Sequence, residues 1–195
     1  DIRSGIVTSV DLTTSPKKIV INNEKTVEAE SVIIATGATA KYLGIPDEAK
    51  YAGMGVSACA TCDGFFYRKK VVAVVGGGDT ACEEAIYLSS LAEKVYLIVR
   101  KPYLRASKIM QDRVLQNPKI EVLFNTNTVG LFGENGVEGA RMVEYKGEPN
   151  ERLSEIAIDG FFLAIGHNPI TEIVNGQIDL DEAGYIKIIP GTPKT

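Results

Sequence analysis

The feature that most constrains the fold of this chain is a glycine-rich turn between a β-branched run and a helical pattern. Residues 71–85 read VVAVVGGGDTACEEA. The uninterrupted run Val71–Val75 is typical of a strand that is covered on both faces of a parallel sheet. A helical pattern then extends from Asp79 to about Leu91. The stretch therefore predicts a strand, a tight turn and a helix, the order found at the start of a nucleotide-binding domain.

Downstream of this turn, strands and helices alternate. We expect a strand at Lys94–Val99, a helix over about 106–116 that ends before Pro118, and a third strand at 119–125. Short strands from 128 to 146 predict an antiparallel β-meander. The predicted fold class is therefore α/β: a Rossmann-like domain of three layers, with a parallel sheet, right-handed crossovers and a β-meander.

Five further segments carry weaker predictions. The run EIAIDGFFLAIG at 155–166 predicts one long apolar strand, and GYIKIIPG at 184–191 predicts a short one. Near the N-terminus, KKIVINN at 17–23 and SVIIATG at 31–37 predict two strands, with a hairpin turn at NNEKT between them. The stretch 42–55 is rich in glycine and contains a proline, which predicts a linker or exposed loop.

The composition of the chain limits the kinds of partner that it is expected to bind. The net charge of −4 gives no basic field that would attract nucleic acid or an anionic membrane, so neither is expected as a partner. The longest apolar runs, such as Phe161–Ile165, are too short to span a bilayer. No export signal is visible at the N-terminus. The chain begins with Asp1 rather than Met, which predicts a fragment or a processed product.

The glycine turn has the spacing of a dinucleotide site. Gly76 permits the tight turn, Gly78 lets the backbone approach a pyrophosphate, and Ala81 is small enough for close packing of helix on sheet. The N-terminus of the following helix favours negative charge. A strand-to-helix turn without a ligand is the weaker alternative, because all these features coincide.

A basic cluster follows the second predicted strand. An NAD site places a carboxylate there to bind the ribose hydroxyls, but this sequence has Arg100, Lys101 and, shortly after, Arg105. Guanidinium and ammonium groups at this position suit a 2′-phosphate, which predicts NADPH as the nucleotide. The alternative is a solvated basic surface.

The three cysteines do not form a disulfide framework. Cys59 and Cys62 form a CxxC pair that could be a redox pair, half of a zinc site or two cysteines in a turn. A structural zinc site needs about four ligands, and the chain offers no second CxxC and only one histidine, His167. We therefore favour the redox pair and expect no metal. Cys82 lies inside the helical pattern and is most simply a small buried residue.

Four stretches, in this order, closely resemble low-molecular-weight thioredoxin reductases of the bacterial type: CATCDGFFYR, VAVVGGGDTACEEA, VRKPYLRAS and LAIGHNPIT. AESVIIATGA also resembles a motif at the edge of the flavin domain of that family. The resemblance implies hydride transfer from NADPH to FAD, then reduction of a Cys59–Cys62 disulfide and finally of thioredoxin. It implies that Cys59 attacks thioredoxin, that Cys62 faces the flavin and that Asp63 is a proton shuttle. Asp63 could instead be a turn residue before Gly64.

The resemblance also implies the residues that bind NADPH, and these are Gly76, Gly77, Gly78, Asp79, Thr80, Ala81, Arg100, Lys101, Arg105, Ile165 and Gly166. Two departures affect this set. The basic cluster lacks the family's usual His and Arg-Arg-Asp start, and Asp79 stands where Asn is frequent. An acid near a pyrophosphate is unfavourable, although its side chain can cap the helix instead.

The resemblance implies a division into 1–44, part of an FAD domain; 45–168, the NADPH domain with the CxxC pair; and 169–195, the start of a return into the FAD domain. The FAD site is expected to be incomplete in this chain, so the chain should bind NADPH without reducing its own disulfide. A hinge is expected near 43–46 and 167–171. The longer enzyme to which this chain would belong, called the parent enzyme below, is expected to be a cytoplasmic homodimer. The alternatives are a reductase of the same kind that serves a peroxiredoxin and a non-catalytic nucleotide-binding module.

Overall fold

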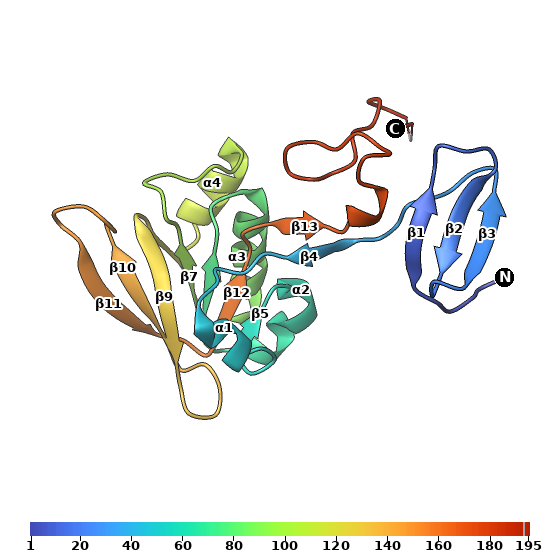
Figure 1. Ribbon diagram of the computed structural model, residues 1–195. Helices are drawn as coiled ribbons and strands as arrows, with labels where there is room; N and C mark the ends of the chain where they lie inside the picture. The colour runs from blue at the N-terminus through green and yellow to red at the C-terminus, as the bar shows by residue number, and fades with distance from the viewer. Residues whose placement is uncertain (193) are drawn as a thin grey trace. The chain divides into compact units, whose positions relative to one another are not determined.

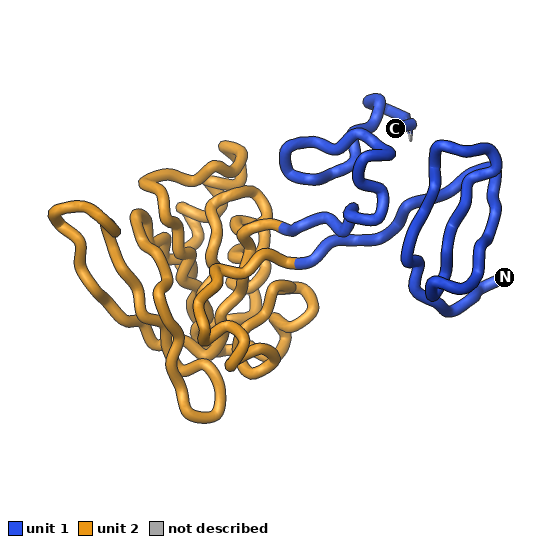
Figure 2. The backbone as a smooth tube through the Cα atoms, in the orientation of Figure 1, with its two compact units in different colours: residues 1–39, 167–195 blue, residues 40–166 orange. Residues whose placement is uncertain are grey.

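The computed structural model describes residues 1–192 and 194–195, and the chain divides into two compact units (Figure 2). Unit 1 comprises Asp1–Thr39 and His167–Thr195, and unit 2 comprises Ala40–Gly166. Unit 2 is therefore inserted between two stretches of unit 1. In the described part of the chain, no helix is long and apolar enough to cross a membrane.

The centre of unit 2 is a parallel sheet of five strands in the order β5-β12-β6-β7-β8 (Figure 1). Its members are β5 (Val56–Ser57), β6 (Val71–Val75), β7 (Lys94–Ile98), β8 (Ile120–Leu123) and β12 (Gly160–Leu163). The middle strand β6 pairs on one side with β7 and on the other with β12, so Val75 lies between Ile98 and Leu163. A strand with neighbours on both sides needs apolar residues on both faces, which explains the VVAVV run.

Two helices cover one face of this sheet. Helix α3 (Asp79–Leu91) connects β6 to β7, and α4 (Lys108–Leu115) connects β7 to β8. The alternate residues Val72 and Val74 of β6 pack in one core cluster with Cys82 and Leu88 of α3 and with Val114 of α4. These residues are fully buried, so the helical layer is held by continuous apolar packing.

The opposite face is covered by an antiparallel meander, in the order β11-β10-β9. It is formed by β9 (Thr126–Phe132), β10 (Gly139–Glu144) and β11 (Arg152–Ala157). Ala73 and Val75, which point away from the helices, share a second core cluster with Leu131 and Met142 of the meander. The predicted α/β fold with a parallel sheet, a meander and three layers is confirmed (Figure 1).

The prediction of one long strand over 155–166 is wrong. The segment is divided between β11, which belongs to the meander, and β12, which belongs to the parallel sheet. The break is at Asp159, whose carboxylate accepts the Val71 N–H at 2.9 Å while its own N–H donates to the Val71 carbonyl at 2.7 Å. The chain changes layers here because Asp159 pairs with the start of β6 rather than continuing the ladder of β11.

The prediction of a linker or exposed loop over 42–55 is also wrong in part. Pro46 begins helix α1 (Pro46–Lys50), a position at which proline is favoured. Tyr51, only 2% exposed, donates its hydroxyl to the Gly133 carbonyl at 2.8 Å. The buried Glu48 carboxylate accepts three backbone N–H groups from residues 43–45 at 2.8, 2.8 and 3.1 Å. The segment is therefore an anchored part of unit 2.

Unit 1 contains an antiparallel sheet of three strands, β1 (Val7–Asp11), β2 (Lys17–Ile21) and β3 (Lys25–Ala29). The predicted hairpin turn after β2 is present, and Asn22 and Asn23 adopt positive φ angles of 54° and 59°. Its second strand is β3, however, and not the predicted 31–37, which forms no strand; Ile33 is 92% exposed. A strand requires a hydrogen-bonding partner, and apolar composition alone does not supply one.

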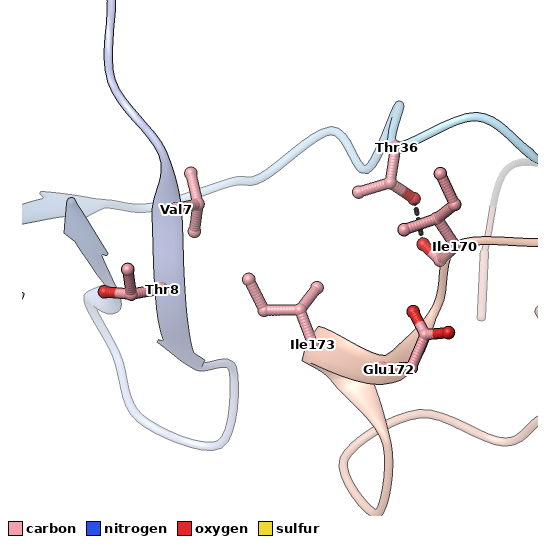
Figure 3. A pocket seen from close by; sticks show the side chains of 6 residues that line it. All are labelled: Val7, Thr8, Thr36, Ile170, Glu172 and Ile173. Atoms are coloured by element: carbon pink, nitrogen blue, oxygen red, sulfur yellow. Dashed lines mark hydrogen bonds between the residues drawn. The ribbon is translucent and has the colours of Figure 1, made fainter. Parts of the chain in front are cut away.

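The remainder of unit 1 is less regular. Two short strands, β4 (Ala38–Ala40) and β13 (His167–Pro169), pair where the chain passes from one unit to the other, and the short helix η2 is formed by Glu172–Val174. The strand predicted at 184–191 is reduced to a single bridge between Leu180 and Ile186. A shallow hollow of about 620 Å³ is lined by Val7, Thr8, Thr36, Ile170, Glu172 and Ile173, and the Thr36 hydroxyl donates to the Ile170 carbonyl (Figure 3).

Candidate functional site

The two cysteines of the CxxC pair are joined in a disulfide. Helix α2 (Ala60–Asp63) begins directly after Cys59, so one helical turn brings both sulfur atoms to the same side. The Cys62 N–H donates to Cys59 Sγ at 3.2 Å, which makes Cys59 the N-cap of this short helix. Cys62 is exposed, whereas Cys59 is partly buried. The two cysteines thus form a disulfide with each other at the surface of unit 2.

A hydroxyl group that the sequence analysis missed links Asp63 to Cys59. Ser57, the last residue of β5, donates its hydroxyl to Asp63 Oδ2 at 2.7 Å and accepts the Cys59 N–H at 3.1 Å. The Asp63 N–H also donates to the Cys59 carbonyl at 3.1 Å. The only sequence signal is a serine two residues before a cysteine, a spacing that suits local hydrogen bonding but is common in turns.

Two exposed aromatic rings follow the disulfide in the short helix η1 (Gly64–Tyr67). Phe65 is 63% exposed and Phe66 is 70% exposed, and their rings meet edge to face with centroids 6.4 Å apart. The Arg68 guanidinium lies 5.0 Å from the centroid of the Phe65 ring. Large apolar side chains side by side at a surface indicate an interaction site when they adjoin a reactive group.

The glycine turn between β6 and α3 has the geometry of a dinucleotide cradle. Gly76 has a φ of 148°, and a Cβ there would lie 2.4 Å from the Ala164 carbonyl oxygen and 2.7 Å from the Ala81 Cβ. Only glycine fits this position. Among the described residues, nothing lies within 4 Å of a Cβ built on Gly78, and no side chain caps the N-terminus of α3. The first amides of the helix therefore remain available to an anion, which fits a pyrophosphate.

Asp79 turns away from the helix N-terminus. Its carboxylate accepts the Ser107 hydroxyl at 2.7 Å and the Ser107 N–H at 2.9 Å, and these bonds lower the pKa of Asp79. The side chain therefore does not cap α3, as the sequence analysis had allowed. It connects the start of α3 to the start of α4 instead, which fixes the intervening basic loop.

That basic loop is also bonded directly to the glycine turn. The Gly77 carbonyl accepts the Arg105 N–H at 2.6 Å and the Ala106 N–H at 3.2 Å. Arg100, Lys101 and Arg105 are exposed, and none of them forms an ion pair within the described residues. The loop that carries these three exposed cations is thus joined to the glycine turn at Arg105.

The end of β12 completes the surroundings of the turn. The Ala164 N–H donates to the Val75 carbonyl at 2.9 Å, so the chain that leaves β12 runs beside the chain that leaves β6. Ile165 is partly buried and Gly166 is exposed with a φ of 102°. The structure therefore brings the glycine turn, the basic loop and the end of β12 together at the carboxyl edge of the sheet.

Cys82 of α3 is fully buried, as predicted, in the apolar core between this helix and the parallel sheet. Burial, with smaller contributions from the charges of Asp79 and Glu83, raises the pKa of its thiol to about 11. The thiolate, which is the reactive form, is therefore scarce at neutral pH.

Glu84 is an ionisable group that the sequence analysis did not single out. Its Oε2 atom is buried and has no hydrogen-bond partner in the described part of the chain. Burial raises the pKa of this carboxyl, and the Ala60 N–H opposes the shift. A raised pKa means that the folded protein prefers neutral Glu84. The contribution of neutral Glu84 to the free energy of unfolding is complete below the unfolded-state pKa of about 4.3, and it is lost as pH rises through the folded-state pKa of Glu84.

We therefore expect Glu84→Gln to stabilise the protein at about pH 8 and to have little effect at about pH 4, because glutamine stays neutral throughout. Thermal unfolding followed by circular dichroism at both pH values measures the difference. Glu83→Gln, at the exposed neighbouring position, is the matched control and should show a smaller change. A Glu84→Gln protein that is less stable than wild type at about pH 8 would contradict the prediction.

The fold and the site together define a class: dinucleotide-binding proteins that carry a CxxC disulfide in the nucleotide-binding unit. The family model described as pyridine nucleotide-disulphide oxidoreductase matches residues 3–190. The chain belongs to this family.

Similarity to individual proteins is more specific. The chain is 46% identical to the thioredoxin reductase of Eremothecium gossypii and 43% identical to that of Rickettsia conorii; each match covers all of this chain and 62% and 63% of the relative. Among solved structures, thioredoxin reductase from Lactococcus lactis superposes with a TM-score of 0.82 at 35% identity, over 93% of this chain and 59% of that one. The resemblance to thioredoxin reductases is thus confirmed. The chain spans about three fifths of the length of these relatives.

Proposed function

We propose that this chain is the nucleotide- and disulfide-bearing part of a thioredoxin-disulfide reductase that passes electrons from NADPH through FAD to Cys59–Cys62 and on to thioredoxin. The observation that carries the proposal is a CxxC disulfide in the same unit as a dinucleotide cradle. The names of the similar proteins support thioredoxin as the electron acceptor.

NADPH fits the edge of the parallel sheet. The turn Gly76–Ala81 would hold the pyrophosphate through backbone amides, and Arg100, Lys101 and Arg105 would bind the 2′-phosphate. Ile165 and Gly166 would line the site from the end of β12. When bound, NADPH supplies the hydride. The three cations form no ion pair within the described residues, and their loop is bonded to the glycine turn through the Arg105 N–H and the Gly77 carbonyl, which supports the phosphorylated nucleotide over NADH.

FAD is proposed for the parent enzyme alone. When bound, it would relay electrons between NADPH and the disulfide. The described residues of unit 1 contain no strand, glycine turn and helix in succession, the arrangement that holds a flavin dinucleotide. No residue of this chain is therefore assigned to FAD. We propose that 1–44 and 169–195 belong to the flavin domain and that 45–168 is the NADPH domain.

The chemistry of this chain is thiol–disulfide exchange. In the reduced form, the thiolate of Cys59 would attack the disulfide of thioredoxin, and the thiol of Cys62 would resolve the mixed disulfide, which restores the Cys59–Cys62 bond. Asp63 would take the proton from the attacking thiol. The Ser57 hydroxyl, which donates to the Asp63 carboxylate and accepts the Cys59 N–H, ties this carboxylate to the CxxC turn and supports the assignment.

The partner surface would include Phe65 and Phe66, which follow the disulfide and are exposed. We expect Phe65→Ser/Phe66→Ser to raise the KM for thioredoxin by about tenfold or more, because burial of each ring contributes about 2 kcal/mol. Turnover of a small substrate such as hydroxyethyl disulfide should change little. Steady-state kinetics of the parent holoenzyme with both substrates provide the test.

Leu153→Ser is the matched control, because Leu153 is an exposed apolar residue of the meander in the same unit. It should leave the KM for thioredoxin unchanged. If the double variant loses activity by the same factor with thioredoxin and with the small disulfide, the two rings do not serve as a docking surface for thioredoxin.

The function itself is tested with the purified parent holoenzyme and NADPH. Thioredoxin, a peroxiredoxin system and no disulfide substrate are compared. Turnover with thioredoxin is expected. Turnover with the peroxiredoxin system alone would indicate a related reductase, and absence of any turnover would indicate a non-catalytic module. A cytoplasmic location and a homodimeric parent stay predictions.

A further inference from the structure

Ser57 occupies the centre of a short hydrogen-bond chain beside the disulfide. It accepts one bond, from the Cys59 N–H at 3.1 Å, and donates its single proton to Asp63 Oδ2 at 2.7 Å. A second acceptor, the Cys59 carbonyl, lies 3.4 Å from the same hydroxyl. The hydroxyl is therefore polarised from one side and directed at the carboxylate on the other.

The backbone leaves Ser57 little freedom to do otherwise. Ser57 is the last residue of β5 and is partly buried, and it pairs with Phe162 in the parallel sheet. Asp63 is held by the Cys59 carbonyl through its own N–H at 3.1 Å. The carboxylate is thus fixed to the CxxC turn at its backbone and, through Ser57, at its side chain.

We infer that Ser57 is a positioning residue for the thiol–disulfide exchange. Its hydroxyl holds the Asp63 carboxylate in place as the proton acceptor for the attacking cysteine. The inference deepens the proposed function and depends on its assignment of Asp63. A hydroxyl that donates to a carboxylate restricts the orientation of that carboxylate, and a proton acceptor must be held within hydrogen-bonding reach of the group it deprotonates.

The exchange can be followed with oxidised glutathione, without nucleotide, flavin or thioredoxin. The first cysteine thiol gives its proton to Asp63, and the thiolate attacks one sulfur of glutathione disulfide and releases one glutathione thiolate. The second cysteine thiol then attacks the mixed disulfide, which forms the Cys59–Cys62 bond and breaks the bond to glutathione; its proton passes to the departing second glutathione, which leaves as the thiol. The protein dithiol loses two electrons and glutathione disulfide gains them; Asp63 returns its proton to solvent.

The test measures the rate at which the fully reduced chain of 195 residues is oxidised by glutathione disulfide. Ser57→Ala should slow oxidation about tenfold, since a hydrogen bond to a charged group is lost. Ser57→Thr and Ser57→Val form a matched pair, because both are β-branched residues that suit a strand and differ by a hydroxyl for a methyl. Thr should stay within about twofold of wild type and Val should be as slow as Ala.

A double-mutant cycle with Asp63→Asn distinguishes positioning from a structural role. If Ser57 acts through Asp63, Ser57→Ala should change the rate of the Asp63→Asn protein by less than about twofold. Ser90→Ala, at an exposed serine on α3, controls for loss of a hydroxyl elsewhere.

Three results would overturn the inference: a Ser57→Ala protein as fast as wild type, equal slowing in the Asp63→Asn background, or a Thr variant as slow as Val. Should Ser57→Ala fail to fold, the Thr and Val pair decides the question. Because the assay contains neither NADPH nor thioredoxin, its outcome is separate from failure of the parent enzyme to reduce thioredoxin.

Discussion

We expect Cys59→Ser and Cys62→Ser each to reduce the proposed thioredoxin turnover of the parent enzyme at least about a thousandfold, because each removes one thiol of an exchanging pair. Without the attacking sulfur no mixed disulfide forms, and without the resolving sulfur it is not released. The structure supports this expectation because the two sulfur atoms are bonded to each other. The measurement is NADPH-dependent reduction of thioredoxin by the holoenzyme.

The two variants should also differ from each other. By the roles proposed above, Cys62→Ser should accumulate a mixed disulfide between Cys59 and thioredoxin, visible by mass under non-reducing conditions, and Cys59→Ser should not. Cys82→Ala serves as the control, because Cys82 is buried and its thiol pKa is about 11. Retention of more than a tenth of the activity by either CxxC variant would contradict the proposed exchange.

Arg100→Ala/Lys101→Ala should lower kcat/KM for NADPH by about a hundredfold, while kcat/KM for NADH changes by less than about threefold. Each cation would form a charge-assisted bond to the 2′-phosphate, and loss of about 1.4 kcal/mol for each corresponds to about tenfold. The fold should be unaffected, because both side chains are exposed and make no ion pair within the described residues. Steady-state kinetics of the holoenzyme with each nucleotide measure the ratio.

Lys108→Ala is the matched control for the basic loop. Lys108 is an exposed cation at the first position of α4, and it is paired with Asp112 at 2.6 Å. Its removal changes the net charge by one without removing a cation of the cluster, so the preference for NADPH should persist. If kcat/KM of the double variant falls by the same factor for NADPH and for NADH, the basic cluster does not bind the 2′-phosphate.

Elements that depend on neighbours in sequence were predicted well. The strand at Val71–Val75, the glycine turn and the helix at Asp79–Leu91 are found as expected. The run VVAVV is apolar on both faces, and Gly76 is required by a positive φ, so each signal lies in consecutive residues. The closeness of the basic loop to the turn was also predictable, because the carboxyl ends of adjacent parallel strands meet at one edge.

Several features of the site were not predictable in this way. Asp79 was considered as a helix cap, but it bonds to Ser107, which lies 28 residues later in the chain. Ser57 carried no distinctive signal, although it connects Asp63 to Cys59. Such side-chain bonds depend on distances that only the folded chain establishes.

The α/β class, the glycine turn between a strand and a helix, and the preference for a redox pair at CxxC were all predictable from the sequence, because they depend on local spacing and on apolar runs. Three other features became visible in the folded chain alone: 155–166 passes between two sheets at Asp159, 42–55 is anchored by Tyr51, and Ser57 holds Asp63. All three have one cause. A strand end, a buried hydroxyl and an oriented carboxylate are each defined by a hydrogen-bonding partner, and local apolar spacing does not specify which residue that partner is.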